Sequence, residues 1–204
     1  MGRFTDRLKE TPSQTAGPYV HIGTVPNFIG IEGVYPADHG AVMVNENTRG
    51  QRITITGRVF DGSGTPLRDA LLEIWQADAD GLFNSRSEMR GTADPEFTGW
   101  GRQPVNLETG IYRFETIKPG RVPFPDGRLQ APHVMFWIVA RGINIGLHTR
   151  MYFGDEEAAN AEDPVLARIE HKVRVPTLIA QVDGNSYTFD IHLQGEKETV
   201  FFDI

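Results

Sequence analysis

The chain has 204 residues, of which 39% are hydrophobic, and this size suits one large domain with a sizeable core. Its formal net charge of −7 argues against a nucleic-acid partner, because DNA- and RNA-binding proteins usually present a basic face. The chain has no cysteine, which excludes disulfides and thiolate metal sites and fits a reducing cytoplasm. No segment has the roughly 18 apolar residues of a membrane span, and the first residues have no apolar run of signal-peptide length.

The N-terminal part of the chain has an unusual composition. Residues 1–40 show no sustained periodicity and carry turn residues throughout. They are nevertheless too apolar for a solvated tail. We predict an extended N-terminal arm over residues 1–50 that packs on a partner subunit or on its own domain. The apolar side chains that support this prediction are Tyr19, Val20, Ile22, Val25, Phe28, Ile29, Ile31, Val34 and Tyr35.

Beyond the arm, the sequence has the pattern of a β protein. Ile53, Ile55 and Val59 alternate with polar residues at the period of a strand. The 22 glycines and 13 prolines favour many short strands over long helices. Residues 133–140 form a nearly continuous apolar run, which is typical of a central strand. The predicted strands cover residues 51–59, 70–76, 110–117, 133–140, 143–153, 178–182, 186–193 and 199–202.

Other segments are predicted to connect these strands. Residues 155–161 are rich in alanine and glutamate and begin with acidic residues, so they predict a short helix. Asp183-Gly-Asn185 predicts a hairpin turn. Residues 84–104 are expected to be irregular. The fold is therefore predicted to be mainly β, with a single β-sandwich domain over residues 51–204, an extended N-terminal arm and short helices.

The histidines give no metal site by their spacing. None of the six forms an H-x-H or an H-E-x-x-H pattern, in which two histidines can bind one metal. His133 and Met135 would share one face of a strand, but a thioether is a poor ligand for Fe(III). A lone buried histidine is usually a hydrogen-bonded core residue. The histidine spacing therefore gives only a weak indication of a metal site, and the sequence also lacks the G-x-S-x-G motif of a nucleophilic serine, so no catalytic residue is predicted from these motifs.

Two arginines lie beside or within apolar runs. Arg141 follows the apolar residues 135–140, and Arg150 lies inside another predicted strand. A guanidinium in apolar surroundings needs a carboxylate or several hydrogen-bond acceptors. An internal salt bridge is the simpler interpretation of each arginine, and a ligand-binding role is the alternative.

Several segments that together span most of the chain carry a resemblance. They are TPSQTAGPYVHIG (11–23), GRVFDGSGTPLRDALLEIWQADADG (57–81), ETIKPG (115–120), APHVMF (131–136), ARGINIGLHTRMYFGDEEAANA (140–161) and GEKETVFFDI (195–204). These segments resemble the intradiol ring-cleavage dioxygenase family, and within it the alpha subunits of protocatechuate 3,4-dioxygenases. The GRV…EIWQAD element is shared across the family, whereas TPSQTAGPY, ARGINI and ETVFFD resemble the alpha subunits in particular.

The resemblance implies where an iron site would lie. Iron-binding members of the family hold non-haem Fe(III) with two tyrosines and two histidines. Those positions fall on Met89, Val122, His133 and Met135 of this chain. Three of the four ligands are therefore replaced, and the remaining imidazole is not enough for a hard trivalent ion. The resemblance implies that Fe(III) is bound by a beta subunit and not by this chain.

The resemblance also implies a role for the arm. In the family the active site lies between an alpha and a beta chain, and a T-x-G-P-Y segment of the alpha chain helps to form the substrate cavity. Those residues are Thr15, Gly17, Pro18 and Tyr19 here, and Arg141 matches an arginine near the cavity entrance. The implied reaction is the intradiol cleavage of protocatechuate by O₂, with Arg141 attracting the substrate carboxylate.

Two other functions are compatible with parts of the sequence. The segment 57–75 also resembles transthyretin-like and carboxypeptidase-regulatory-like domains, which would make the protein a non-catalytic β-sandwich binding module. A self-sufficient dioxygenase homodimer is a further alternative, but the residues at Met89, Val122 and Met135 argue against it. The arm together with ARGINI and ETVFFD distinguishes the alpha-subunit hypothesis from a binding module, which has no reason to carry these segments.

Overall fold

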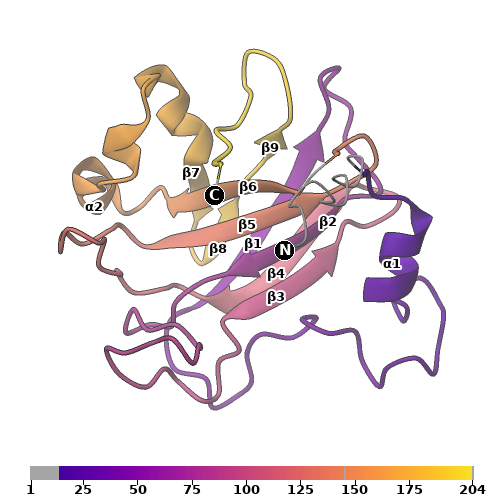
Figure 1. The fold of residues 1–204 in the computed structure, drawn as a ribbon, viewed down its shortest axis with the longest axis horizontal. Helices are drawn as coiled ribbons and strands as arrows, with labels where there is room; N and C mark the ends of the chain where they lie inside the picture. The colour runs from indigo at the N-terminus through magenta and orange to yellow at the C-terminus, as the bar shows by residue number, and fades with distance from the viewer. Residues whose placement is uncertain (1–13, 145, 204) are drawn as a thin grey trace, which may run out of the picture.

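The computed structural model describes residues 14–144 and 146–203, and it confirms a mainly β fold (Figure 1). Within these residues, nine strands form one sheet in which β3, β2, β5, β6, β7, β8, β1 and β4 are neighbours in that order and β9 pairs with β1. The strands are β1 (Arg52–Phe60), β2 (Leu71–Trp75), β3 (Trp100–Pro104), β4 (Ile111–Ile117), β5 (His133–Val139), β6 (Leu147–Phe153), β7 (Ile179–Asp183), β8 (Ser186–Thr188) and β9 (Ile191–His192).

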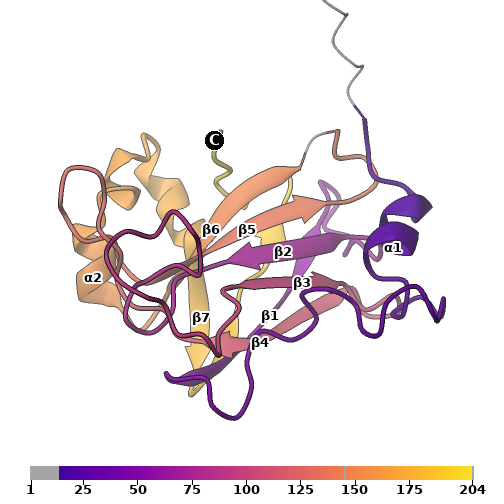
Figure 2. The same cartoon turned by 60° about the horizontal axis from the view of Figure 1, so that its bottom comes forward.

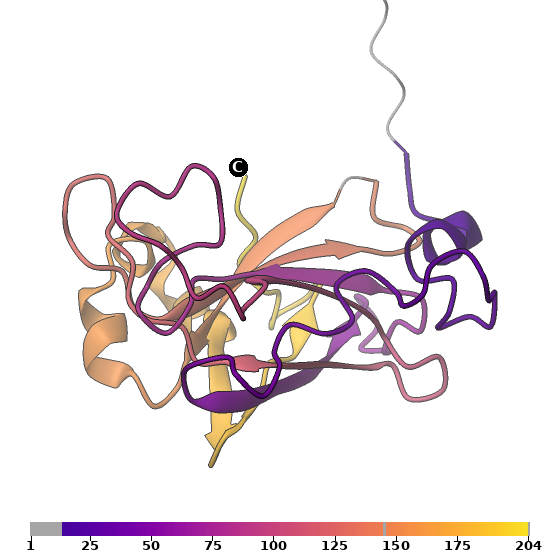
Figure 3. The same ribbon diagram turned by 90° about the horizontal axis from the view of Figure 1, so that it is seen from below.

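The sheet folds over to form two layers, which can be seen in Figures 2 and 3. One layer contains β3, β2, β5 and β6, and the other contains β8, β1 and β4. Strand β7 joins them, because it pairs in parallel with β6 and antiparallel with β8. The predicted β-sandwich is therefore correct in its layers, with the addition that one continuous sheet supplies both.

The core lies between the two layers and follows from the alternation of side chains along each strand. On β5, Val134, Phe136 and Ile138 are fully buried and belong to the main hydrophobic cluster. His133, Met135 and Trp137 therefore project from the opposite face of the same strand. We call this side of the β3-β2-β5-β6 layer the outer face, and the candidate site lies along it and at its edge.

The arm is more ordered than its sequence predicts. It contains a short helix, α1 (Pro18–Thr24), at one end of the layers (Figures 1 and 2). Proline at the first helical position explains the start, since its fixed φ suits that position and its missing N–H is not needed there. Further along, Arg102 N–H donates to the Gly40 carbonyl at 2.8 Å, so this part of the arm packs on its own domain.

The opposite end of the layers carries α2 (Glu157–Glu162) and two 3-10 helices, η1 (Leu166–Arg168) and η2 (Lys172–Leu178) (Figure 1). The helix predicted over residues 155–161 is therefore confirmed. Asp163 fastens this end to the sheet, because its carboxylate accepts hydrogen bonds from the N–H groups of Ala131, Val165 and Leu166. The Ala131 bond fixes the backbone just before His133.

Three expectations differ from the structure. Residues 84–104, expected to be irregular, end in strand β3. Its inward position is Gly101, where a side chain would meet Met43 at 2.5 Å, so β3 shows no apolar alternation. Residues 199–202 form only an isolated bridge between Phe202 and His148, and the segment 186–193 divides into two short strands. No helix in the described ranges has the length and apolarity required to cross a membrane.

Candidate functional site

The residues that were predicted to bind a substrate gather largely around one cavity. Its volume is about 380 Å³, and it lies between α1 and the end of β5. Gly17, Pro18 and Arg141 all line it, although the arm and the loop after β5 are far apart in the sequence. We call it the arm cavity. Its lining is completed by Ala16, His21, Ile22, Ile29, Asp69 and Leu107.

Thr15 connects the arm to the loop that carries Arg141. Its hydroxyl accepts a hydrogen bond from Gly142 N–H at 2.9 Å and lies 3.4 Å from the Ala140 carbonyl, to which it donates. These two groups flank Arg141 on both sides. Gly142 has φ of +92°, a conformation that favours glycine. Thr15 thus holds the loop in the geometry that places Arg141 at the arm cavity.

Arg141 combines an ion pair with exposure. Its Nε lies 3.2 Å from Oδ2 of Asp69, and its side chain is 79% exposed. An exposed pair of this kind contributes about 1 kcal/mol or less to stability. The guanidinium has five N–H donors, so one contact with Asp69 leaves others for an anion. The ion pair and the ligand-binding role, which were alternatives on sequence, are therefore compatible.

His21 is a cavity residue that sequence reasoning missed. The side chain is buried, and within the described residues its Nε2 has no hydrogen-bond partner. Burial lowers the pKa of His21, and the nearby Asp69 carboxylate acts in the opposite direction. A neutral imidazole can both donate and accept a hydrogen bond. His21 belongs to the segment TPSQTAGPYVHIG, which carries the resemblance to the alpha subunits and could have pointed to it. The spacing of the histidines could not, because no second histidine lies at a metal-binding distance along the sequence from His21.

Tyr19 lies apart from the other predicted residues. It is 84% exposed and lines a second, open cavity of about 820 Å³, along with Thr15, Trp137 and His148. The start of helix α1, with its N-cap Gly17, therefore presents Gly17 and Pro18 to the arm cavity and Tyr19 to the outer face of the sheet. The structure brings together Thr15, Gly17, Pro18 and Arg141, but it does not bring Tyr19 to the same cavity.

The four positions where the family's iron ligands would fall do not form a metal site. Met89 is 89% exposed, and Val122 is buried and apolar. His133 Nδ1 is 2.8 Å from the Ala131 carbonyl, and burial together with the Arg150 charge lowers its pKa to about 4. Among the described residues no group of three or more His, Cys, Asp or Glu could hold a metal ion. These side chains do not fit Fe(III), which prefers anionic oxygen ligands.

Arg150 differs from the predicted internal salt bridge. It pairs across the sheet with Met135, and its Nη1 donates to Oε1 of Gln130 at 2.8 Å. Its guanidinium carbon lies 5.7 Å from the centre of the Phe202 ring. Within residues 14–144 and 146–203 it forms no ion pair, because an amide and an aromatic face take the place of a carboxylate. The salt-bridge prediction is therefore wrong for Arg150, and a fixed positive charge lies beside Met135.

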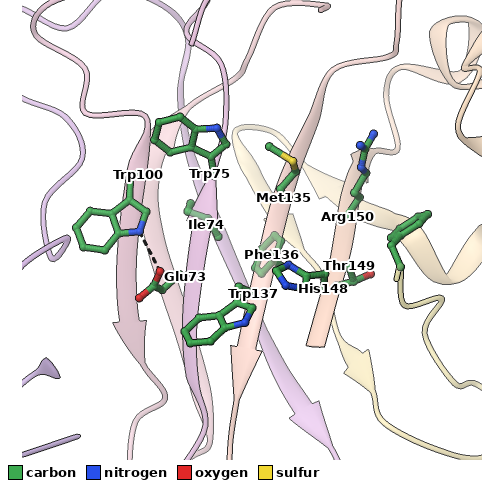
Figure 4. Close-up of a pocket in the computed structure, with 11 residues that line it drawn as sticks. Glu73, Ile74, Trp75, Trp100, Met135, Phe136, Trp137, His148, Thr149 and Arg150 are labelled. Atoms are coloured by element: carbon green, nitrogen blue, oxygen red, sulfur yellow. Dashed lines mark hydrogen bonds between the residues drawn. The ribbon is translucent and has the colours of Figure 1, made fainter. Parts of the chain in front are cut away.

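A further cavity, of about 270 Å³, lies on the outer face between Trp75 and Arg150 (Figure 4). We call it the tryptophan cavity, because Trp75, Trp100 and Trp137 line it from three neighbouring strands. In Figure 4, Trp75 and the Arg150 guanidinium lie toward one end, and Trp137 lies toward the other. The remaining lining residues are Glu73, Ile74, Met135, Phe136, His148, Thr149 and Phe202.

Comparison with known proteins places the chain in a family. The family model described as "Dioxygenase" matches residues 24–195. The protocatechuate 3,4-dioxygenase alpha chain of Pseudomonas putida is 44% identical over 200 residues, which cover 96% of this chain and 97% of the relative. The protocatechuate 3,4-dioxygenase beta chain of Burkholderia cepacia is 33% identical, over 83% of this chain and 77% of the relative.

Solved structures agree on the fold. The crystal structure of 3-chlorocatechol 1,2-dioxygenase from Rhodococcus opacus 1CP matches 79% of this chain and 69% of that chain, with a TM-score of 0.57 and 20% sequence identity. At this identity the likeness shows the fold alone. The family model and the near full-length similarity to an alpha chain carry the assignment further. The chain therefore belongs to the intradiol dioxygenase family, among the alpha chains of protocatechuate 3,4-dioxygenases.

Proposed function

We propose that this chain is the alpha subunit of a protocatechuate 3,4-dioxygenase, which binds no iron itself and helps to form the substrate cavity of an alpha–beta assembly. The observation that carries the proposal is the arm cavity, in which Gly17 and Pro18 face the exposed guanidinium of Arg141. The Gly-Pro segment gives a compact and rigid backbone wall. Arg141 gives a charge that attracts the carboxylate of 3,4-dihydroxybenzoate.

The arm supplies a surface for the beta chain. Five apolar side chains between residues 19 and 34 are substantially exposed, and we infer that they meet the beta chain, because exposed apolar surface on a folded protein is typical of an interaction site. Their contact with a partner would exclude water from the arm cavity. They are Tyr19 (84% exposed), Ile22 (40%), Phe28 (41%), Ile31 (37%) and Val34 (52%).

The proposed assembly divides the chemistry between its subunits. The beta chain would hold Fe(III), which supplies the activation of the catechol ring toward O₂. In the overall reaction the bond between the two hydroxyl-bearing ring carbons breaks, and each new carboxylate receives one atom of O₂, giving 3-carboxy-cis,cis-muconate. This chain would contribute orientation of the substrate carboxylate and exclusion of water, and it would donate no metal ligand. We place the assembly in the cytoplasm, in line with the cysteine-free sequence.

Co-expression tests the proposal directly. The chain is produced alone, the beta chain of the same organism is produced alone, and the two are produced together. Metal content and O₂ uptake with 3,4-dihydroxybenzoate are then measured for each. We expect no bound iron and no activity in this chain alone, and an iron-loaded, active complex when both are present. An isolated chain that binds iron and consumes O₂ would favour the self-sufficient homodimer and would overturn the proposal.

The same experiment distinguishes the proposed alpha subunit from a non-catalytic binding module. A non-catalytic binding module would not co-purify with the beta chain and would not change its activity. The proposal requires that a tag on this chain retains the beta chain through gel filtration. It also requires a higher kcat/KM for the complex than for the beta chain alone.

A further inference from the structure

The tryptophan cavity contains all three tryptophans of the chain. They come from β2, β3 and β5, and each is only partly buried on the outer face. Phe83 stacks on Trp75 with the two rings nearly parallel and their centres 6.0 Å apart, and this contact supports the orientation of the indole. Aromatic walls of this kind favour a flat apolar ligand, because ring faces and edges attract one another at such distances.

The cavity is lined by one acidic residue, Glu73, and one arginine, Arg150, and among the described residues only the arginine has a charge that is not paired with an opposite charge. Glu73 is already neutralised, since its Oε1 lies 2.7 Å from Nη2 of Arg102 and its Oε2 accepts a hydrogen bond from Trp100 Nε1 at 3.2 Å. Arg150 bonds a neutral amide, Gln130 Oε1, and stacks on Phe202. A guanidinium has five donors, and one is used by Gln130. The charge offered to a ligand is therefore the positive charge of Arg150.

We propose that the tryptophan cavity binds a single-ring aromatic monocarboxylate, with the ring against the tryptophans and the carboxylate on Arg150. The volume of about 270 Å³ is slightly below the usual ligand-pocket range of about 300–1,000 Å³, which favours one ring over a larger ligand. Apolar and aromatic walls with a few polar groups are the common composition of a small-molecule site. A carboxylate pairs with a guanidinium in a planar, two-point geometry.

The tryptophan cavity adjoins the open cavity lined by Tyr19, with which it shares Trp137 and His148, but it can be tested separately from the proposed function. The tryptophan cavity shares no lining residue with the arm cavity, where Arg141 would meet the substrate. Its binding can be measured on this chain without iron and without the beta chain. A failure of the proposed function would therefore appear in the co-expression experiment, and a failure of this binding site would appear in a ligand titration of the isolated chain.

The test is a titration of the full chain with benzoate, followed by intrinsic tryptophan fluorescence and by calorimetry. Because every tryptophan lines the cavity, occupancy changes the whole emission signal rather than a small part of it. We expect saturable binding of one benzoate per chain with Kd at or below about 1 mM. No saturable change up to about 20 mM benzoate, twenty times that value, would overturn the proposal.

Variants and ligand analogues identify the anchor. Arg150→Gln removes the charge and keeps a hydrogen-bonding side chain, and we expect it to weaken benzoate binding by about tenfold or more. Arg113→Gln is the matched control, because Arg113 is an exposed arginine of β4 paired with Glu115 outside the cavity. Benzamide, which has the same ring without the charge, should bind the wild type about tenfold more weakly than benzoate.

Two results contradict the assignment of the anchor. Equal binding of benzoate by the wild type and Arg150→Gln would show that the charge is not used. Equal binding of benzamide and benzoate by the wild type would show the same from the ligand side. Arg150→Lys, which keeps the charge without the planar fork, should bind benzoate between the wild type and Arg150→Gln. Near-ultraviolet circular dichroism of each variant establishes that the aromatic packing is retained.

Discussion

His133 is a buried histidine whose environment can be described atom by atom. It lies at the start of β5, where one imidazole nitrogen bonds the Ala131 carbonyl and the ring packs near Tyr152. Met135 and Arg150 are cross-strand partners on the same face. The neighbouring positive charge and the burial both favour a neutral ring. His133 is therefore a buried, neutral residue in a part of the sheet that does not suit a metal cation.

The lowered pKa of His133 predicts a pH-dependent stability. Its pKa is about 4 in the folded protein against 6.5 for an unperturbed histidine, so between these values the unfolded chain binds the extra proton. Stability from this residue is present above pH 6.5 and is lost as the pH falls toward 4. At about 1.4 kcal/mol for each pKa unit, the loss is about 3 kcal/mol. Urea unfolding at pH 7.0 and pH 4.5 would measure it.

His133→Asn is the control for this effect. The asparagine amide can still donate to the Ala131 carbonyl but does not titrate. We expect the variant to be less stable than the wild type at pH 7 and to lose less stability between pH 7.0 and pH 4.5. The same pH dependence in both proteins would assign the effect to other groups, such as His21, whose pKa is also lowered by burial.

Arg141 gives the second prediction at the scale of single residues. Arg141→Ala in the assembled enzyme removes the charge that would attract the substrate carboxylate, and we expect KM to rise by about tenfold with a smaller change in kcat. Steady-state kinetics with 3,4-dihydroxybenzoate and with catechol, which lacks the carboxylate, would check this. Arg113→Ala serves as the control. If the variant leaves KM and kcat unchanged for both substrates, Arg141 does not bind the substrate.

At the scale of elements, the sandwich depends on close backbone contact between β1 and the segment that follows β8. Gly57 lies on β1, and a Cβ added there would be 1.9 Å from the Phe189 carbonyl oxygen. The same carbonyl accepts a hydrogen bond from the buried hydroxyl of Tyr112 on β4. Three segments thus meet at one carbonyl, which explains why a glycine interrupts the apolar alternation of β1.

This contact predicts that Gly57→Ala is strongly destabilising. A backbone carbonyl cannot move aside as a flexible side chain can, so we expect a loss of about 3 kcal/mol in the free energy of unfolding. Gly23→Ala is a suitable control, because Gly23 lies in helix α1 with nothing within 4 Å of the added Cβ. That substitution should leave stability unchanged or raise it by up to about 1 kcal/mol. Chemical denaturation of both variants would decide the point.

At the scale of the whole molecule, the helical end and the arm end have different surfaces. Asp163 and its hydrogen bonds close the end that carries α2. The arm end exposes the apolar side chains of residues 19–34. Such a surface is costly to leave in water and is usual where a second chain binds.

We therefore expect charged substitutions in the arm to weaken the alpha–beta assembly. Phe28→Glu combined with Val34→Glu places two carboxylates in the apolar surface without touching the sheet core. The affinity for the beta chain should fall by about tenfold or more, while the unfolding of the isolated chain stays the same. Val173→Glu is the control, since Val173 is 88% exposed at the helical end. Equal weakening by both changes would contradict an interface at the arm.

Much of the fold follows from local sequence. The alternation of Ile53, Ile55 and Val59 gives β1, and the apolar run 133–140 gives β5, because the period of buried side chains is a property of each segment alone. Strand β3 was missed since its inward residue is Gly101, which is small to accommodate Met43 from the arm. Helix α1 was missed because seven residues beginning with proline are too few to show a helical period.

The candidate site also has some features that follow from the sequence and others that depend on the tertiary structure. Sequence by itself determined the β architecture, the absence of thiol chemistry and, through resemblance, the family. Only the tertiary structure decided that Thr15 bonds Gly142, 127 positions away, and that Asp69 pairs with Arg141. It also decided that Arg150, which lines the tryptophan cavity, bonds the Gln130 amide. A segment's period depends on its own residues, whereas a cavity depends on side chains that are adjacent only after the sheet has folded over.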